Sequence, residues 1–499
     1  MADSHFDVLI VGAGLSGIGA AVHLQQKCPS KSYVILEGRD AMGGTWDLFR
    51  YPGIRSDSDM HTLGYEFKPW TDAKAIADGP SIKRYVRETA DEHDITQHIR
   101  FGHKVTAASW SSEEARWQVT AEHGGQSVTF TCSFLYMCSG YYKYEAGYTP
   151  DFEGMADFSG EIVHPQLWTD DIDYADKKVV VIGSGATAVT LIPELAKDAD
   201  HVVMLQRSPT YMVSRPARDG LANALRAVLP DRWAYSLTRW KNIRLSSWFY
   251  KRSQTKPEKV KQNLLKMLGK HLKPGYDIET HFTPSYGPWD QRLCLVPDAD
   301  MFDALNSGKA SIVTDHIERF EAKGIRLKSG ELLEADLIVT ATGLDLQVFG
   351  GLSLEVDGKA LNSGELVNYK GIMFGGVPNF ANTFGYTNAS WTLKADITAE
   401  YVCRLLNHLD ETGTQICVPE FPETGIEVEA DPPLSSGYFA RAVDRLPKQG
   451  SDMPWQQTHD YLNDRKVLRD HPLKDGYMKF VAIDATTPSS SSEKVLDPA

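Results

Sequence analysis

The chain has 499 residues, of which 42% are hydrophobic and 24% are charged. These are ordinary globular values, so disorder and fibrous repetition are excluded. At about 150 residues per domain, the length indicates roughly three structural units. The 66 acidic and 52 basic residues give a net charge of −14, which argues against general binding to nucleic acid.

The six cysteines include no C-x-x-C pair, and five residues separate Cys132 from Cys138. This spacing argues against a zinc ribbon or a redox-active pair and fits a reducing compartment. We predict no metal site. A strand-like run begins at Phe6 with no basic segment before it, and no apolar stretch approaches the roughly 18 residues of a spanning helix. The expected location is therefore the cytoplasm.

The N-terminal part of the chain predicts a dinucleotide site. An apolar strand over residues 6–11 precedes the turn Gly12-Ala13-Gly14-Leu15-Ser16-Gly17, and a helix to about Lys27 and a strand over residues 33–37 follow. Glycines let the backbone approach a pyrophosphate, and the helix N-terminus offers N–H donors. Glu37 can accept hydrogen bonds from an adenosine ribose. The alternative is a glycine-rich turn of another α/β fold. The expected site residues are Gly12, Gly14, Ser16, Gly17 and Glu37.

A second copy of this pattern follows. A strand over residues 179–182 precedes Gly183-Ser184-Gly185-Ala186-Thr187-Ala188, and a helix and a strand over residues 201–205 come next. That strand ends in Arg207 and Ser208 and not in an acid. A guanidinium can bind a 2′-phosphate that a carboxylate would repel, although an arginine here can also be an ordinary solvated residue. The acid and the arginine predict FAD at the first site and NADPH at the second.

Two further strand-like runs, residues 134–140 and 336–343, each end in a turn of small residues. They bracket the second nucleotide unit and fit two crossings between one nucleotide-binding domain and another inserted into it. Alternatively, either run is an ordinary sheet strand. We expect an α/β fold with two Rossmann-like dinucleotide-binding domains, for FAD and NADPH.

Two segments narrow the chemistry. In the first, Gly43-Gly44-Thr45-Trp46 is followed by Tyr51-Pro52-Gly53 and by Asp57. In the second, Phe158-Ser159-Gly160 is followed by His164 and Trp168. Together they resemble the fingerprints of class B flavoprotein monooxygenases, and of type I Baeyer–Villiger monooxygenases in particular. The flavin-containing monooxygenases, which are relatives of these enzymes, usually carry Tyr where this chain has Trp168.

The resemblance extends from Asp7 to about Leu406 and is closest to the ethionamide-activating, thioamide-oxidising branch. The closer match lies in residues 47–60, 289–297 and 385–396. Two positions depart from the family pattern. Thr169 stands where the fingerprint tends to have Pro or Asp, and Gln291 stands where many members have a Lys that contacts the 2′-phosphate. The second departure leaves more of the NADPH selection to Arg207 and Ser208.

The resemblance implies an NADPH- and O₂-dependent enzyme that converts ketones to esters or lactones through a C4a-peroxyflavin, with sulfoxidation as a side activity. A peroxide anion needs a fixed cation in a site that excludes water, and Arg stays charged at any working pH. Arg292 matches the catalytic arginine of the family, and Asp57 matches the carboxylate that holds it. Without the resemblance, Arg292 is equally well explained as a surface ion-pair residue. The cofactor-site residues that the resemblance adds are Gly44, Thr45, Trp46, Tyr51, Arg55, Asp57, Val105 and Trp391.

A helix is predicted from Trp391 to about His408, with Ser390 as its N-cap. Its N-terminus would stabilise negative charge on reduced flavin. Trp391 packs on the cofactor, closes the substrate pocket or belongs to the core. His164 is a catalytic candidate by residue type, but a histidine in a linker is more often structural. In the family, its motif couples domain movement to turnover.

Residues 221–273 hold 13 Lys and Arg but only two acids, a local net charge of +11, so the rest of the chain carries −25. Apolar spacings over 221–229 and 260–268 predict amphipathic helices, which in the family form a helical insertion over the substrate pocket. The bases are either the solvated face of this insertion or, because six aromatic residues lie among them, a surface for anionic membranes. We hypothesise peripheral membrane contact through 221–273.

The expected units follow from this organisation. Residues 1–145 and 342–486 form the FAD domain, the latter with a C-terminal wrap, and 487–499 form a disordered tail. Residues 146–215, which include the linker, and 280–341 form the NADPH domain, and 216–279 form the helical insertion.

Other functions stay open. The first is a flavin-containing monooxygenase acting mainly on nitrogen or sulfur, which Trp168 and Arg292 disfavour. The second is a membrane-associated flavin-binding scaffold without turnover. A disulfide reductase would need a cysteine pair, and none is suitably spaced. The expected partners are small ketone or thioether substrates and no nucleic acid.

Overall fold

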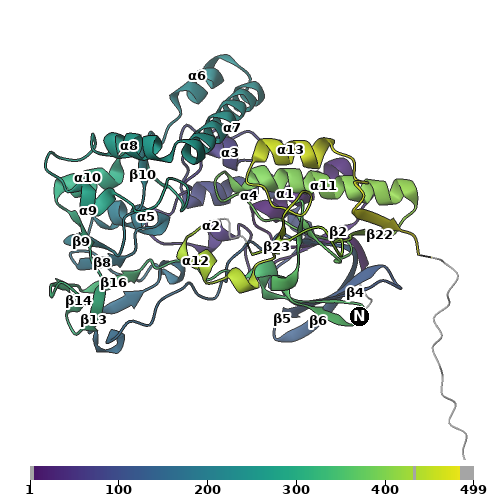
Figure 1. The fold of residues 1–499 in the computed structure, drawn as a ribbon, viewed down its shortest axis with the longest axis horizontal. Helices are drawn as coiled ribbons and strands as arrows, with labels where there is room; N and C mark the ends of the chain where they lie inside the picture. Colours follow the sequence, from purple (N-terminus) through teal and green to yellow (C-terminus); the bar gives the residue numbers. More distant parts are fainter. Residues whose placement is uncertain (1–4, 431–433, 484–499) are drawn as a thin grey trace, which may run out of the picture.

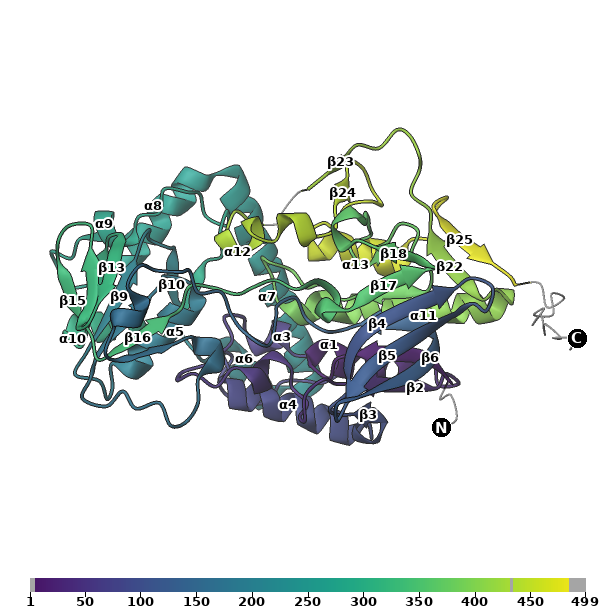
Figure 2. The same cartoon turned by 90° about the horizontal axis from the view of Figure 1, so that it is seen from below.

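The computed structural model describes residues 5–430 and 434–483. It has two lobes, each built on one large sheet (Figures 1 and 2). The segments 431–433 and 484–499, which include the whole of the expected tail 487–499, lie outside the described residues. No described helix combines the length and the apolar character needed to cross a bilayer.

The sheet of the first lobe has nine strands in the order β18-β17-β4-β5-β6-β1-β2-β3, and β21 also pairs with β6. β1 lies parallel to both β2 and β6, and its central residues are fully buried, as expected for a strand covered on both faces. The strands are β1 His5–Val11, β2 Tyr33–Leu36, β3 Ile99–Arg100, β4 Lys104–Ser111, β5 Arg116–His123, β6 Gln126–Met137, β17 Ser353–Val356, β18 Lys359–Leu361 and β21 Phe380–Asn382.

The sheet of the second lobe has five parallel strands in the order β12-β9-β8-β16-β7. They are β7 Glu161–Val163, β8 Lys178–Ile182, β9 His201–Gln206, β12 Ala310–Thr314 and β16 Leu337–Thr340. Smaller sheets surround the two lobes. They are formed by β10 Met212–Arg215 with β11 Cys294–Pro297, β13 Ile317–Glu321 with β14 Gly324–Leu327 and β15 Leu332–Glu334, β19 Asn368–Tyr369 with β20 Met373–Phe374, β22 Ile416–Pro419 with β25 Met478–Val481, and β23 Val428–Glu429 with β24 Gln449–Gly450.

Helices cover both sheets. α1 and α11 pack against each other in the apolar core that also holds β1 (Figure 1). The helices are α1 Leu15–Lys27, α2 Thr45–Leu48, α3 Met60–Leu63, α4 Gly79–Glu92, α5 Ala186–Leu195, α6 Gly220–Val228, α7 Asp231–Thr255, α8 Pro257–Leu268, α9 Ile278–Phe282, α10 Asp300–Ser307, α11 Trp391–Thr412, α12 Gly437–Ala440 and α13 Tyr461–Asp470. Short 3₁₀ helices are η1 Thr96–His98, η2 Met155–Asp157, η3 Pro165–Leu167, η4 Val348–Gly351, η5 Ser363–Glu365 and η6 Val443–Arg445.

The chain passes between the lobes twice, after β6 and after β16. The two crossing segments lie antiparallel, with a bridge between Tyr142 and Leu346. The N–H of Lys143 donates to the carbonyl of Asp345 at 2.8 Å, and that of Tyr148 to Gly343 at 3.0 Å. The runs 134–140 and 336–343 therefore end where the chain leaves a sheet. We propose that the boundaries expected from the sequence separate the two lobes at these crossings.

The segment 221–273 is largely helical, as predicted. The apolar spacing indicates the buried residues correctly in α8 but not in α6. In α8 the predicted inward residues Val260, Leu264 and Leu268 are buried. In α6, by contrast, Leu221 and Val228 are exposed. α6 packs mainly on α7 and not on a sheet, so it buries Ala222 but leaves these two larger residues in solvent. All six cysteines are buried as free thiols.

Candidate active site

The turn after β1 needs its glycines. Gly12 has a φ of +105°, and a Cβ there would lie 2.6 Å from the carbonyl oxygen of Cys138. A Cβ on Gly17 would lie 1.9 Å from the carbonyl oxygen of Gly12. Glycine alone permits both the turn and the close start of α1 beside β1. The N–H groups of the first turn of α1 are thereby held beside the ends of the central strands.

Glu37 follows β2 and points back to this turn. Its Oε2 accepts a hydrogen bond from the N–H of Ala13 at 2.7 Å, and its Oε1 accepts one from the N–H of Arg39 at 3.0 Å. Burial raises the pKa of Glu37, although both hydrogen bonds oppose the rise. The backbone thus fixes a carboxylate where a ribose could donate to it.

The second turn repeats this construction. Gly183 has a φ of +134°, and a Cβ there would lie 2.3 Å from the carbonyl oxygen of Ala341. Gly185 precedes α5 and faces open space. The Oγ of Ser184 donates to the carbonyl of Ser208 at 3.0 Å, which joins the turn to the end of β9. Arg207 is exposed beside it and forms no ion pair with a described residue.

Both turns open into one cavity of about 890 Å³, in the upper part of the range of ligand sites. Two predicted cofactor residues, Gly17 and Ala188, do not line it. Both are buried in the first turns of their helices, where they serve packing. The predicted residues that do line it are Gly12, Gly14, Ser16, Glu37, Gly44, Thr45, Trp46, Tyr51, Arg55, Asp57, Val105, Gly183, Ser184, Gly185, Ala186, Thr187, Arg207, Ser208, Arg292 and Trp391.

Arg292 and Asp57 meet in this cavity from different lobes. Asp57 lies between α2 and α3 of the first lobe, and Arg292 lies just before β11. The Nε of Arg292 is 2.6 Å from Oδ2 of Asp57, and its second guanidinium nitrogen is 2.7 Å from Oδ1. This bidentate geometry fixes the plane of the guanidinium. The Asp57 carboxylate also raises the pKa of Arg292 further above its usual range.

The turn that carries Arg292 is fastened by the C-terminal part of the chain. Trp289 has a φ of +74°, and the carboxylate of Asp290 accepts from the N–H of Gly287 at 2.7 Å. The N–H of Ser435, 3.0 Å away, and its hydroxyl, 2.9 Å away, both donate to the carbonyl of Asp290. The segment before α12 therefore helps to position the arginine.

Aromatic side chains form one wall beside Arg292. The rings of Tyr141 and Trp391 stack with centroids 5.2 Å apart. The indole nitrogen of Trp391 donates to the Oγ of Ser16 at 2.7 Å, which ties the start of α11 to α1. Burial raises the pKa of Tyr141, so its hydroxyl stays protonated. Tyr141 and Tyr438, which both line the cavity, were missed from the sequence, although Tyr141 directly follows the predicted turn at Gly140.

Ser390 occupies the N-cap of α11 as predicted, but its side chain does not cap the helix. Its Oγ lies instead 2.6 Å from the hydroxyl of Thr62. The hydroxyl thus joins α11 to α3, and the first N–H groups of α11 receive no side-chain cap.

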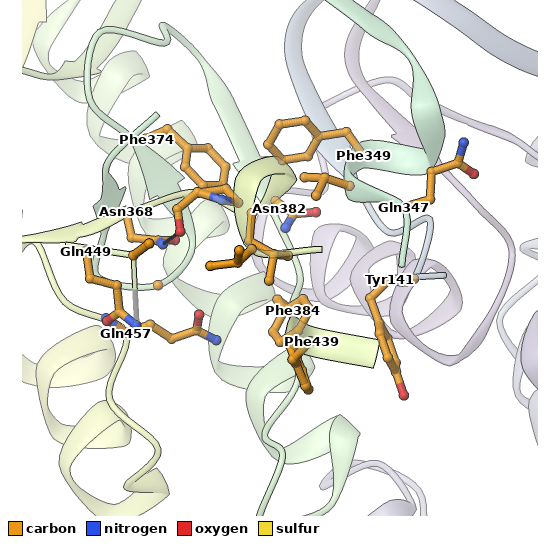
Figure 3. Close-up of a pocket in the computed structure, with 17 residues that line it drawn as sticks. Tyr141, Gln347, Phe349, Asn368, Phe374, Asn382, Phe384, Phe439, Gln449 and Gln457 are labelled. Carbon is orange, nitrogen blue, oxygen red and sulfur yellow. Dashed lines mark hydrogen bonds between the residues drawn. The ribbon is translucent and has the colours of Figure 1, made fainter. Parts of the chain in front are cut away.

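A smaller chamber of about 60 Å³ lies behind Tyr141 (Figure 3). Tyr141, Gln347 and Phe349 line both it and the main cavity. Its other walls are aromatic, aliphatic or carry carboxamides, and among the described residues no charged side chain lines it. In Figure 3 the labelled residues around it are Tyr141, Gln347, Phe349, Asn368, Phe374, Asn382, Phe384, Phe439, Gln449 and Gln457. The chamber can therefore hold an uncharged, mainly apolar group.

Three other predicted residues have defined contacts. Thr45 accepts a hydrogen bond from the hydroxyl of Tyr142 at 2.5 Å. Arg55 forms an ion pair with Asp300 in α10, so its charge is already partnered across the lobes. Val105 is buried in β4 with one edge at the cavity.

His164 lies outside the cavity, at the crossings. Its Nε2 is 3.2 Å from the carbonyl of Gly343, and its Nδ1 accepts from the N–H of Gln166 at 3.2 Å. Burial lowers the pKa of His164. The side chain thus ties the start of η3 to the second crossing.

The chain matches known proteins over nearly its whole length. Residues 70–272 match the family described as flavin-binding monooxygenase-like, and residues 10–78 match an NAD(P)-binding Rossmann-like domain. The FAD-containing monooxygenase EthA of Mycobacterium tuberculosis is 53% identical over 477 residues, which cover 95% of this chain and 98% of that protein. This chain belongs to the FAD-containing monooxygenase family. EthA of Mycolicibacterium smegmatis is 51% identical over 489 residues, which cover 98% of this chain and 99% of that protein.

Solved structures agree with this monooxygenase fold. A steroid monooxygenase bound to NADP is similar with a TM-score of 0.76 at 22% identity, covering 96% of this chain and 100% of that chain. The predicted family and fold class are confirmed. The predicted cofactors are confirmed as well: EthA is named as containing FAD, and the solved steroid monooxygenase is bound to NADP.

The site of this monooxygenase fits FAD. Gly12 and Gly17 let α1 start close to β1, because a side chain at either position would meet backbone. Gly12 and Gly14 line the cavity at this end of α1, where a pyrophosphate could lie beside the helix N-terminus. Glu37 offers a fixed acceptor for a ribose. The cavity is continuous from this turn to Arg292, so one bound molecule can reach from Glu37 toward the arginine.

Proposed function

We propose that this monooxygenase uses NADPH and O₂ to convert ketones to esters or lactones, with sulfoxidation of thioethers as a side activity. One observation carries the proposal. The guanidinium of Arg292 faces the cavity and is held by both oxygens of Asp57, at 2.6 and 2.7 Å, and both nucleotide turns open into the same cavity.

When bound, FAD supplies the redox chemistry that links NADPH to O₂. Gly12, Gly14 and Glu37 would hold its adenosine diphosphate part. Gly183, Gly185 and Arg207 would hold NADPH, with the exposed guanidinium of Arg207 on the 2′-phosphate.

Arg292 supplies a fixed positive charge. Insertion of oxygen beside a ketone carbonyl requires a nucleophilic oxygen that keeps its negative charge, and a guanidinium stabilises that charge without giving up a proton. Asp57 orients the guanidinium through two hydrogen bonds. The stacked Tyr141 and Trp391 would exclude water from one side, which strengthens the electrostatic effect of Arg292.

The chamber behind Tyr141 would take the uncharged arm of the substrate. Its lining of Phe349, Phe384 and Phe439 favours alkyl or aryl groups, and burying a carboxylate there without a cation would be costly. We therefore expect neutral ketones to be better substrates than keto acids.

The test uses the purified FAD-loaded protein with matched linear, cyclic and aromatic ketones, keto acids and thioethers. NADPH oxidation and product mass are both measured. Ester or lactone formation from neutral ketones is the expected outcome. Products confined to sulfoxides or N-oxides would favour the flavin-containing monooxygenase alternative, and absence of NADPH consumption would favour the flavin-binding scaffold.

A further inference from the structure

The inner face of α7 is fixed to the first lobe. The guanidinium of Arg239 is buried and donates to the carbonyls of Gly64 at 2.7 Å and His61 at 3.0 Å. The hydroxyl of Tyr235 donates to the carbonyl of Tyr65 at 2.9 Å. These contacts set the rotation of the helix about its own axis. The opposite face is therefore presented to solvent in one defined orientation.

That outer face is apolar and aromatic. Trp233, Leu237, Trp240 and Trp248 follow one another at helical spacing and are 67%, 48%, 58% and 58% exposed. Side chains spaced in this way share one side of a helix. We call these four residues the outer stripe. In Figure 1, α7 lies with α6 at the upper edge of the molecule.

Basic side chains lie directly on the outer stripe. The guanidinium of Arg244 lies 4.7 Å from the ring centroid of Trp240, and that of Arg252 lies 5.8 Å from that of Trp248. Within the part of the chain that the structure describes, neither arginine forms an ion pair. Their charges are thus free to act on a partner.

The charge of the segment selects that partner. Residues 221–273 carry +11 while the rest of the chain carries −25. A second copy of this chain, stripe to stripe, would bring two basic segments together. An anionic lipid surface is attracted to the segment, and exposed Trp and Leu side chains gain by entering its headgroup boundary.

We propose that the outer stripe, with Arg244 and Arg252, docks the protein on an anionic lipid surface, with α7 lying in the plane of that surface. Trp240 and Trp248 enter the boundary between headgroups and acyl chains, while the two arginines remain at the level of the phosphates. The inference is independent of the substrate that the enzyme oxidises.

The first experiment uses the full-length FAD-loaded protein and flotation with phosphatidylcholine vesicles, alone or with about 30% phosphatidylglycerol. We expect at least tenfold tighter binding to the anionic vesicles and most of the difference to vanish in about 0.5 M NaCl, where exposed charges are screened. Equal binding to both vesicles, or none to either, would overturn the proposal.

Variants then locate the surface. Trp240→Ser with Trp248→Ser, and separately Arg244→Glu, should each weaken binding to anionic vesicles roughly five- to tenfold. Lys359→Glu, an exposed base in β18 of the first lobe, is the matched charge control and should bind like the unmodified protein. NADPH oxidation without vesicles should be equal in all four proteins. If the tryptophan variant instead turned a dimer into a monomer in sedimentation, and vesicle binding were unchanged, the stripe would be a self-association surface and the proposal would be wrong.

Discussion

Arg292 owes its place to contacts from two distant parts of the chain. Asp57 holds its guanidinium, and the segment before α12 holds the turn that carries it. A charge-assisted bidentate pair is both stronger and more directional than a single hydrogen bond. The cation thus has a fixed position before any ligand arrives.

Replacing Arg292 by Ala should reduce the rate of ester formation about 10²- to 10³-fold, which is the loss expected when one preorganised donor is removed. Arg292→Lys keeps the charge but loses the bidentate fork, so it should recover only part of the rate. Product formation is measured by mass, with FAD content checked from absorbance. A rate within twofold of the unmodified enzyme in Arg292→Ala would contradict the assigned role.

Arg207→Gln should raise the KM for NADPH about tenfold or more, because a charged hydrogen bond to the 2′-phosphate contributes roughly 1.5–3 kcal/mol. The KM for NADH should change little, since NADH lacks that phosphate. Arg319→Gln, an exposed arginine of β13 outside the cavity, is the control. Equal effects on both nucleotides would show that Arg207 does not select between them.

Much of the site was accessible from sequence because its residues follow strand ends. Glu37 ends one predicted strand, Arg207 comes two residues after another, and the glycines fall between a strand and a helix. Tyr141 could not be assigned a role in this way, because its partner Trp391 is 250 positions away and sequence spacing carries no information about that contact. The capping role predicted for Ser390 failed for a related reason. The hydroxyl of Ser390 pairs with that of Thr62, which is far away in the sequence, instead of with the first N–H groups of α11.

At the scale of elements, α1 can approach β1 closely because the residue at the contact is glycine and has no side chain. Gly17→Ala would place a methyl group 1.9 Å from the carbonyl oxygen of Gly12, so α1 must move away. We expect purified Gly17→Ala protein to lose most of its FAD, as measured by absorbance per chain. Gly220→Ala, at an open position of α6, should retain full FAD content. Normal FAD content in both variants would contradict this account of the turn.

α7 shows why an element can be predicted while its orientation cannot. Arg239 is buried and Trp240 is exposed, which is the reverse of what hydropathy alone would favour. A guanidinium can be buried here because backbone carbonyls accept its hydrogen bonds and the carboxylate of Asp396 balances its charge, so the cost of removing it from water is offset. Those partners lie in α3, the turn after it and α11, and no local pattern in α7 indicates them.

The packing between α11 and α13 predicts an acid sensitivity. Burial lowers the pKa of His459 to about 4, and the nearby Lys394 lowers it further while Asp464 opposes the shift. Below the usual pKa of histidine, the unfolded chain binds a proton that the folded chain refuses, so stability falls as the pH drops from about 6.5 to about 4. The loss from this one group reaches about 3 kcal/mol at the lower end.

His459→Gln removes this titration. Its thermal unfolding midpoint should therefore decrease less between pH 7 and about pH 4 than that of the unmodified protein. The quantity compared is the change of the unfolding midpoint with pH in each protein. A destabilisation that is equal at all pH values therefore does not affect the result. Parallel slopes would exclude His459 as the source.

For the whole molecule, two ion pairs join the lobes beside the cavity, Arg292 with Asp57 and Arg55 with Asp300. Asp300→Asn should weaken the junction without touching the first pair. We expect faster hydrogen exchange at the amides of Lys143 and Tyr148, which bond across the two crossings. Asp173→Asn, which breaks an exposed pair with Lys177 within one lobe, should leave these amides unchanged. Unaltered exchange in Asp300→Asn would show that the pair does not restrain the lobes.

The antiparallel crossings also limit which motions the enzyme can make. Bending one lobe sideways, in the plane of the two connecting segments, would lengthen one segment while compressing the other, and the hydrogen bonds from Lys143 and Tyr148 oppose such shear. Bending perpendicular to the plane of the two segments changes neither their lengths nor the hydrogen bonds between them. The joint thus favours motion like that of a leaf hinge, in which the second lobe swings toward or away from the first while keeping the same edge turned to it.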